Sequence, residues 1–173
     1  TLQCSTRLPT PPRMDEGGDQ KLAVLFVGLG NIGRSPMAEG AFRKAAEEAG
    51  LDCEVESVGT ASYHIGEAPD PRAIATARKH GVDISAALGR QLEPRDFDRF
   101  SHIFALDTAN LAGITSKTPR GARAKVSLLM DVVPGREGET VADPYYGDES
   151  DFEDAWDEIA LATRHLAEKL KAV

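Results

Sequence analysis

The stretch VLFVGLGNIGRSPMAEGAF, residues 24–42, joins an apolar run to a helix-like segment through a loop rich in glycine. The apolar run, Ala23 to Val27, is typical of a strand buried on both faces of a parallel sheet. After the loop, Ser35 predicts an N-cap, Pro36 stands at the first helical position, and apolar residues at helical spacing predict a helix over 35–49. A strand, a tight loop and a helix in this order indicate an α/β fold.

The remainder of the chain continues to alternate short apolar segments with amphipathic ones. We therefore predict a single α/β domain of three layers, in which a four-stranded parallel sheet is flanked by helices. Folds of this kind bind ligands beyond the carboxyl ends of their strands, which is where the glycine-rich loop lies. The predicted strands are 54–58, 102–106 and 125–129, and the predicted helices are 71–80, a brief segment after Asp107, and 151–171.

Net charge and cysteine content narrow the classes of partner and site. The formal net charge is −8 and the isoelectric point is about 5.0, so we expect neither nucleic acid nor a membrane surface as a partner. Cys4 and Cys53 are the only cysteines, and they lack the spacing of metal ligands. We therefore expect no disulfide, no metal and no cofactor, and a cytoplasmic location.

The length of 173 residues suits one compact domain. Residues 1–20 are polar and rich in proline, and their first part lacks the hydrophobic segment of a secretory signal. We expect residues 1–20 to form a disordered leader outside the fold, with residues 21–173 as the domain.

The glycine-rich loop admits two functional interpretations. The first is a dinucleotide site, because Gly28, Gly30 and Gly33 have the spacing of a Rossmann fingerprint, and the stretch resembles the opening of the β-hydroxyacid dehydrogenases. Such a site also needs an acidic residue that binds the ribose, and Glu56 is only a fair match for that residue. A chain of this length also leaves little room for a substrate domain, so the chain would be a fragment of an NAD-binding oxidoreductase.

The second interpretation is a phosphate loop. Successive main-chain amides from Leu29 to Arg34 would surround an oxyanion at the start of the following helix. The planar guanidinium of Arg34 would bind two phosphate oxygens at once, which a dehydrogenase does not need at this position.

The whole chain from residue 22 to about residue 170 resembles the low-molecular-weight protein-tyrosine phosphatases. This set of matches is highly specific, and nothing downstream of the loop resembles a dehydrogenase. The matching stretches are VLFVxLGNIxRSPMAEGAF at 24–42, SYHIGEAPDPRA at 62–73, KHGVDIS at 79–85, RQL at 90–92, LDTANL at 106–111 and DPYYGDESDFEDAW at 143–156.

The resemblance implies roles for the loop residues. In that family a cysteine thiolate attacks phosphotyrosine, and Gly28 stands at its position. Arg34 matches the arginine that binds the transition state, Ser35 matches the hydroxyl that steadies the thiolate, and Asn31 matches the residue that shapes the loop. The resemblance thus makes Leu29, Gly30, Asn31, Ile32, Gly33, Arg34 and Ser35 the expected phosphate-binding residues.

The resemblance also implies roles for residues outside the loop. Asp143 matches the general acid that protonates the departing phenolate. The rings of Tyr63, Tyr145 and Tyr146 are expected to wall a cleft that sandwiches an aryl phosphate. The expected ligands are therefore a phosphotyrosine protein, a small aryl phosphate or inorganic phosphate.

Three departures from the family pattern concern this one site. Gly28 replaces the nucleophile, Gly33 replaces a second loop cysteine, and Ala87 stands where many members have a histidine that braces the loop. Because glycine has no side chain, no covalent phosphoenzyme can form at position 28, and we expect hydrolysis to be severely impaired or absent. Phosphate binding depends on main-chain amides and Arg34, so we expect it to persist.

Several alternatives stay open at this stage. The chain is either a vestigial phosphatase, a non-catalytic phosphotyrosine-binding or phosphate-binding module, or an active phosphatase whose two cysteines were replaced by engineering or error. Arsenate reduction is excluded for lack of further cysteines. The remaining candidates have structural explanations: His64 and His80 are expected at the surface or at a helix end, Asp107 as the anchor of a loop, and Cys53 as a small core residue.

Overall fold

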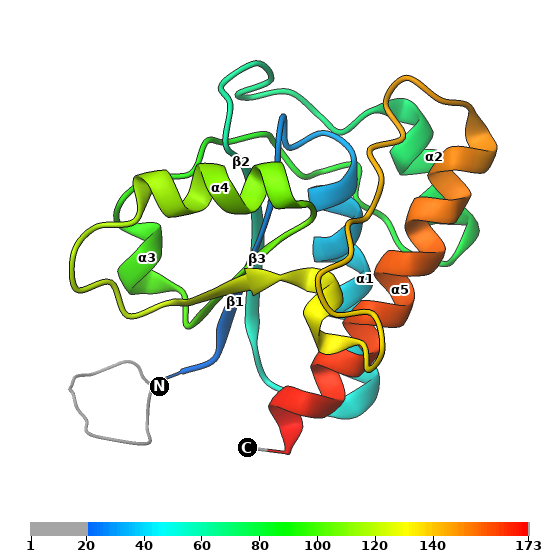
Figure 1. Cartoon of the computed structure of the whole chain (residues 1–173). Coiled ribbons are helices and arrows are strands. Elements are labelled where there is room, and N and C mark those ends of the chain that lie inside the picture. The colour runs from blue at the N-terminus through cyan, green and yellow to red at the C-terminus, as the bar shows by residue number, and fades with distance from the viewer. Residues whose placement is uncertain (1–20, 173) are drawn as a thin grey trace, which may run out of the picture.

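The structure is a computed structural model that describes residues 21–172, so the expected leader at 1–20 lies outside the described residues. A four-stranded sheet with the order β2-β1-β3-β4 forms the middle layer (Figure 1). All three strand pairs are parallel. The strands are β1 (Ala23–Gly28), β2 (Glu54–Gly59), β3 (His102–Ala105) and β4 (Lys125–Leu128). The predicted fold class is confirmed.

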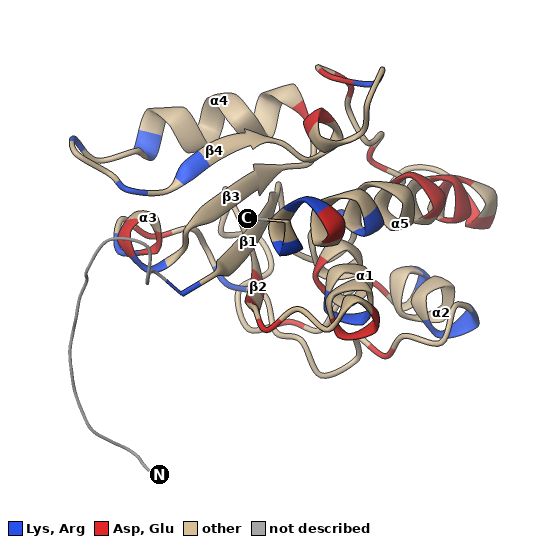
Figure 2. Ribbon diagram, turned by 90° about the horizontal axis from the view of Figure 1, so that it is seen from below, with Lys and Arg blue, Asp and Glu red and all other residues tan. Residues whose placement is uncertain are grey.

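Helices cover both faces of the sheet (Figures 1 and 2). One face packs on the long helices α1 (Arg34–Ala49) and α5 (Glu149–Lys171), with α2 (Pro71–Lys79) beside them. The other face packs on α3 (Asp96–Arg99) and α4 (Thr108–Lys117), and a short 3-10 helix, η2 (Leu129–Val132), follows β4. In the described part of the chain, no helix has the length and apolar composition needed to cross a bilayer.

The central strand β1 explains why the sheet has two buried faces. Val24 and Phe26 point into the core under α1 and α5, whereas Leu25 and Val27 point into the core under α3 and α4. All four side chains are fully buried, and each contributes about 1.5–3 kcal/mol by leaving water. An unbroken apolar run is therefore what this strand requires, and its carboxyl end delivers the glycine-rich loop to the edge of the sheet.

The start of α1 differs from the prediction. The helix begins at Arg34, with Gly33 as N-cap and no side-chain cap, so Ser35 lies inside the first turn and is not the N-cap. The hydroxyl of Ser35 instead accepts a hydrogen bond of 2.9 Å from the side chain of Asn31. The serine was misassigned because its sequence neighbour Pro36 fits a capping pattern, while its partner lies in the loop.

Candidate functional site

A cleft of about 220 Å³ opens at the carboxyl end of β1, between the loop after β1, the segment after β2 and the segment before α5. Every residue proposed for the site from the sequence lines it. The cleft also contains four residues that were not proposed. Its lining residues are Gly28, Leu29, Gly30, Asn31, Ile32, Gly33, Arg34, Ser35, Tyr63, His64, Asp70, Asp143, Pro144, Tyr145, Tyr146 and Phe152.

The floor of the cleft is the main chain of the loop. Residues outside the loop donate hydrogen bonds to its carbonyl groups. The carbonyl of Leu29 accepts from the Ala61 amide at 2.9 Å, and the carbonyl of Ile32 accepts from the Asp70 amide at 2.7 Å. Within residues 21–172, the amides from Leu29 to Arg34 donate no hydrogen bond to another main-chain group or side chain. Such a run of unpaired donors at a helix N-terminus is the arrangement that binds oxyanions.

Arg34 projects from the first turn of α1 into the base of the cleft. Its Nη1 donates to Asp107 Oδ2 at 2.8 Å and to the carbonyl of Val141 at 2.7 Å, and its Nη2 lies 3.7 Å from Asp143 Oδ2. The residue is only 5% exposed. The guanidinium is thus fixed beside the loop amides by groups from two other segments.

Asp107 does more than anchor a loop. One carboxylate oxygen accepts from the amide of Asn110 and so caps α4, while the other accepts from Arg34. Sequence reasoning assigned it only the anchoring role. The signal for the second role was an acidic residue two positions after β3, at the ligand-binding edge of the sheet.

Gly28 faces the hydroxyl of Ser35 at the bottom of the loop. A Cβ atom at position 28 would lie 3.4 Å from Ser35 Oγ and 3.5 Å from Ser35 Cβ, which is ordinary van der Waals contact. A Cβ atom at Gly33 would meet nothing within 4 Å. Both positions therefore have room for a side chain.

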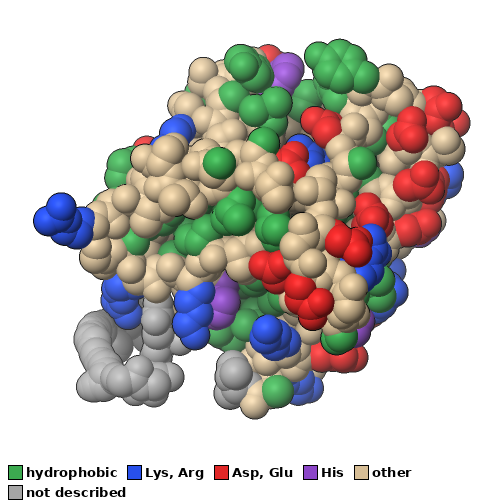
Figure 3. Space-filling view, in the orientation of Figure 1, with side chains coloured by type: hydrophobic (Ala, Val, Ile, Leu, Met, Phe, Trp, Pro, Cys, Tyr) green, Lys and Arg blue, Asp and Glu red, His purple; other side chains and the backbone are tan. Residues whose placement is uncertain are grey.

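Aromatic rings form the rim of the cleft. Tyr63 is 70% exposed, and Tyr145 and Tyr146 pack edge to face with their ring centroids 4.9 Å apart. Figure 3 shows hydrophobic side chains projecting at the top of the molecule, toward which β1 and β2 run in Figure 1. Asp143 stands beside this rim, and its Oδ1 accepts from the Tyr145 amide at 3.1 Å, so the turn expected from Asp-Pro is also present.

Arg72 on α2 holds the segment that carries these tyrosines. Its guanidinium donates to the carbonyls of Tyr145 at 2.9 Å and Gly147 at 3.1 Å, and it lies over the ring of Phe152. Its hydrogen bonds to Asp70 hold the pKa of that carboxyl below its usual value. Neither residue was proposed from the sequence, although an Asp directly before Pro at a helix start indicates an N-cap.

His64, His80 and Cys53 were expected at the surface, at a helix end or in the core. His80 is the C-cap of α2, a helix end as expected, but His64 lines the cleft, with Nδ1 2.9 Å from Glu67. Cys53 is partly buried against the core just before β2, at the edge of the sheet opposite the cleft. Burial, followed by the nearby charges of Asp52 and Glu54, raises the pKa of its thiol to about 11, so at neutral pH it is a poor nucleophile.

One group of possible metal ligands is present among the described residues, formed by His80, Glu153 and Asp157. His80 Nε2 already lies 3.0 Å from Glu153 Oε2, and Lys79 Nζ lies 2.8 Å from the other oxygen of Glu153. Both oxygens of Glu153 are thus already engaged, and none of the three residues lines the cleft.

Comparison with known proteins agrees with this geometry. The model of the family described as low molecular weight phosphotyrosine protein phosphatase matches residues 23–173. The chain belongs to this family. A low molecular weight phosphotyrosine protein phosphatase of Schizosaccharomyces pombe is 42% identical over 140 residues, which cover 79% of this chain and 89% of that protein.

Solved structures extend the comparison. A protein tyrosine phosphatase from Entamoeba histolytica superposes with a TM-score of 0.83 and 32% identity, covering 88% of this chain and 98% of that chain. A Drosophila arginine phosphatase superposes with a TM-score of 0.80 and 31% identity, covering 86% of this chain and 97% of that chain.

Membership of this phosphatase family removes the support for a dinucleotide site. Its ribose candidate, Glu56, is absent from the cleft lining and forms ion pairs with Arg90 and Arg99.

Proposed function

We propose that this member of the phosphatase family binds phosphotyrosine, another aryl phosphate or inorganic phosphate in the loop 28–35, but is a pseudophosphatase that turns these ligands over very poorly. The observation that carries the proposal is the run of unpaired amides from Leu29 to Arg34 next to a position, Gly28, that has no nucleophile.

Binding is supported by three groups that do not depend on residue 28. The loop amides and the N-terminus of α1 supply partial positive charge, and Arg34 supplies a full charge in a fixed orientation. The aromatic rim of Tyr63, Tyr145 and Tyr146 favours a phosphorylated ring over a phosphorylated guanidinium, because flat apolar faces pack well against it. The aryl phosphates are therefore the preferred ligand class.

Turnover is limited by the missing attacking atom. In a two-step phosphatase mechanism the nucleophile displaces the phenolate while Asp143 donates the proton, and water later cleaves the phosphoenzyme. Without a side chain at position 28, only water can attack phosphorus. By analogy with hydrolases stripped of their nucleophile, about 10³ to 10⁴-fold acceleration over water remains from positioning and charge stabilisation.

A non-catalytic module that recognises phosphotyrosine is the second candidate. It is favoured by the same observation, since the binding groups are kept and only the nucleophile is replaced. The two candidates share a binding step and differ only in whether the residual turnover has a use. For either, we infer a cytoplasmic location from the low cysteine content.

The decisive experiment restores the missing atom. Gly28→Cys is expected to raise the rate on para-nitrophenyl phosphate by several orders of magnitude, because the room at position 28 puts the new thiol beside Ser35 and the loop amides. Gly33→Cys is the matched control, since it adds the same side chain to the same loop without supplying the nucleophile and is expected to leave the rate low.

Three results would contradict the proposal. A stoichiometric burst of nitrophenol from the unaltered chain would mean that a covalent intermediate forms without a cysteine at position 28. An equal and low rate in both cysteine variants would mean that the roles of Arg34 and Asp143 are wrong. Competition by NADH, but not by inorganic phosphate, would instead restore the dinucleotide interpretation.

A further inference from the structure

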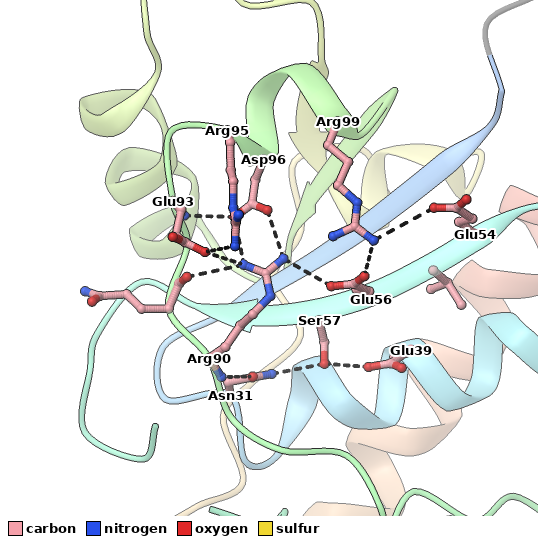
Figure 4. Close-up of polar contacts among 12 residues, drawn as sticks. Asn31, Glu39, Glu54, Glu56, Ser57, Arg90, Glu93, Arg95, Asp96 and Arg99 are labelled. Atoms are coloured by element: carbon pink, nitrogen blue, oxygen red, sulfur yellow. Dashed lines mark hydrogen bonds and ion pairs between the residues drawn. The ribbon is translucent and has the colours of Figure 1, made fainter. Parts of the chain in front are cut away.

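Asn31 is the one residue other than glycine with a positive φ, 62°, in the described chain. This left-handed conformation is unfavourable for most residues and persists only where surrounding contacts fix it. The side chain of Asn31 is buried and donates to Ser35 Oγ at 2.9 Å and to Ser57 Oγ at 3.0 Å. Ser57 in turn donates to Glu39 at 2.7 Å, as Figure 4 shows. The side-chain amide of Asn31 therefore holds the bend in the middle of the loop.

The remaining contact of Asn31 comes from a separate segment. Its Oδ1 accepts from the main-chain amide of Arg90 at 2.9 Å. Arg90 is itself attached to the end of β2, because its carbonyl accepts from Gly59 at 2.9 Å and the neighbouring Gln91 pairs with Gly59 in a parallel bridge. Ala87, where the resemblance placed a bracing histidine, has only a methyl side chain and cannot form a hydrogen bond to the loop.

The side chain of Arg90 fixes the position of that amide. Its two terminal nitrogens donate to the two oxygens of Asp96 at 3.0 and 2.8 Å, and one of them donates also to Glu56 at 3.1 Å (Figure 4). Asp96 is 1% exposed and accepts in addition from the amide of Glu93 at 2.8 Å. A bidentate pair on a buried carboxylate is geometrically specific, and a buried charge that loses its partner is strongly destabilising.

We propose that Arg90 is a positioning residue for the phosphate loop, and that its ion pair with Asp96 holds the amide that keeps Asn31 in the left-handed conformation. The inference rests on the proposed function, because the property that it governs is oxyanion binding by the loop. Arg90 itself does not touch the ligand, since it does not line the cleft. It acts through one hydrogen bond to Asn31.

A double-mutant cycle tests this route. Dissociation constants for inorganic phosphate are measured by amide chemical-shift titration for the unaltered chain, Arg90→Lys, Asn31→Gly and the double variant. Lysine keeps the charge but loses the bidentate pair, and glycine adopts a positive φ without support. Arg99→Lys is the matched control, because Arg99 also pairs with Glu56, but among the described residues its ion pairs go to Glu54 and Glu56 and not to Asp96, and it does not line the cleft. Should Arg90→Lys fail to fold, Asp96→Glu displaces the same carboxylate and takes its place.

The expected result is coupling between the two positions. Arg90→Lys weakens phosphate binding about 10-fold in the chain with Asn31 and less than about 2-fold in the Asn31→Gly background, while Arg99→Lys changes it by less than about 2-fold. Equal effects of Arg90→Lys in both backgrounds, or an effect of Arg99→Lys as large, would overturn the inference and leave the proposed function standing. If the unaltered chain binds no phosphate, the proposed function fails, and this inference fails with it.

Discussion

Arg34 and Asp107 meet at 2.8 Å at the base of the cleft, with the guanidinium almost fully buried and the carboxylate also capping α4. We expect Asp107→Ala to lower the free energy of unfolding by about 2–4 kcal/mol. The lost helix cap accounts for about 1 kcal/mol. The buried guanidinium loses its nearer carboxylate and keeps only Asp143 at 3.7 Å, which accounts for about 1–3 kcal/mol. Urea unfolding measured by circular dichroism gives the difference.

Asp148→Ala is the matched control for this prediction. Asp148 caps α5 through its side chain in the same way but makes no contact with Arg34. The control therefore loses a cap only, and we expect a smaller loss of stability. Equal losses in the two variants would mean that the contact between Arg34 and Asp107 contributes nothing beyond the cap.

Gly28 and Gly59 are paired in register at the carboxyl ends of β1 and β2, yet they tolerate a methyl group differently. A Cβ atom at Gly59 would lie 2.6 Å from the carbonyl oxygen of Leu29, which is main chain and cannot turn aside. At Gly28 the nearest atom would be 3.4 Å away. We expect Gly59→Ala to destabilise the chain by about 1–3 kcal/mol through overpacking.

Gly28→Ala serves as the reference for that measurement. We expect it to change the free energy of unfolding by no more than about 0.5 kcal/mol in either direction. Thermal or urea unfolding of the two alanine variants compares them directly. A Gly28→Ala variant as unstable as Gly59→Ala would show that the loop has no room at position 28. That outcome would also remove the structural basis for restoring a cysteine there.

The sequence predicted the sheet and the principal helices because their burial repeats along the chain. The fully buried β1 reads as an unbroken apolar run, and α5 reads as an amphipathic stripe. The four-residue helix α3 was not predicted, since it is shorter than the periods on which such patterns depend. Its purpose becomes visible only through the side chain of Asp96, whose partner Arg90 lies in a different segment.

The residues of the candidate site also fall into those that the sequence predicted and those that it did not. The loop, Arg34, Asp143 and the three tyrosines were proposed because short matching stretches contain them, and the fold gathers them around one cleft. Asp107 was given a minor role and Arg72 was missed because their partners, Arg34 for the first and Tyr145 and Gly147 for the second, lie about 70 residues away or more. Asp70 was missed with Arg72, because its role is to hold that arginine. A sequence pattern fixes the type of such a residue, whereas the contact that uses it follows from packing.

We expect the ion pair between Asp70 and Arg72 to make the stability of the folded chain sensitive to acid. Because the pKa of Asp70 is lowered in the folded chain by its hydrogen bonds to Arg72, its contribution to stability is complete above the pKa of the unfolded chain, about 4. The contribution is lost as the pH falls through the lower, folded value. We therefore expect Asp70→Asn to be less stable than the unaltered chain at pH 5, with a difference that shrinks steadily between pH 4 and pH 2.

Urea unfolding at pH 5, 4, 3 and 2 measures this dependence, and Arg72→Gln provides a second approach to the same pair. Removing the arginine returns the carboxyl toward its ordinary pKa, so the Arg72→Gln chain is expected to show the same flattened acid profile as Asp70→Asn. Asparagine also caps helices well, so the comparison isolates the charge of Asp70 from its role at the start of α2. Stability curves that remain parallel for all three chains from pH 5 to pH 2 would show that the pair is not the source of the acid sensitivity.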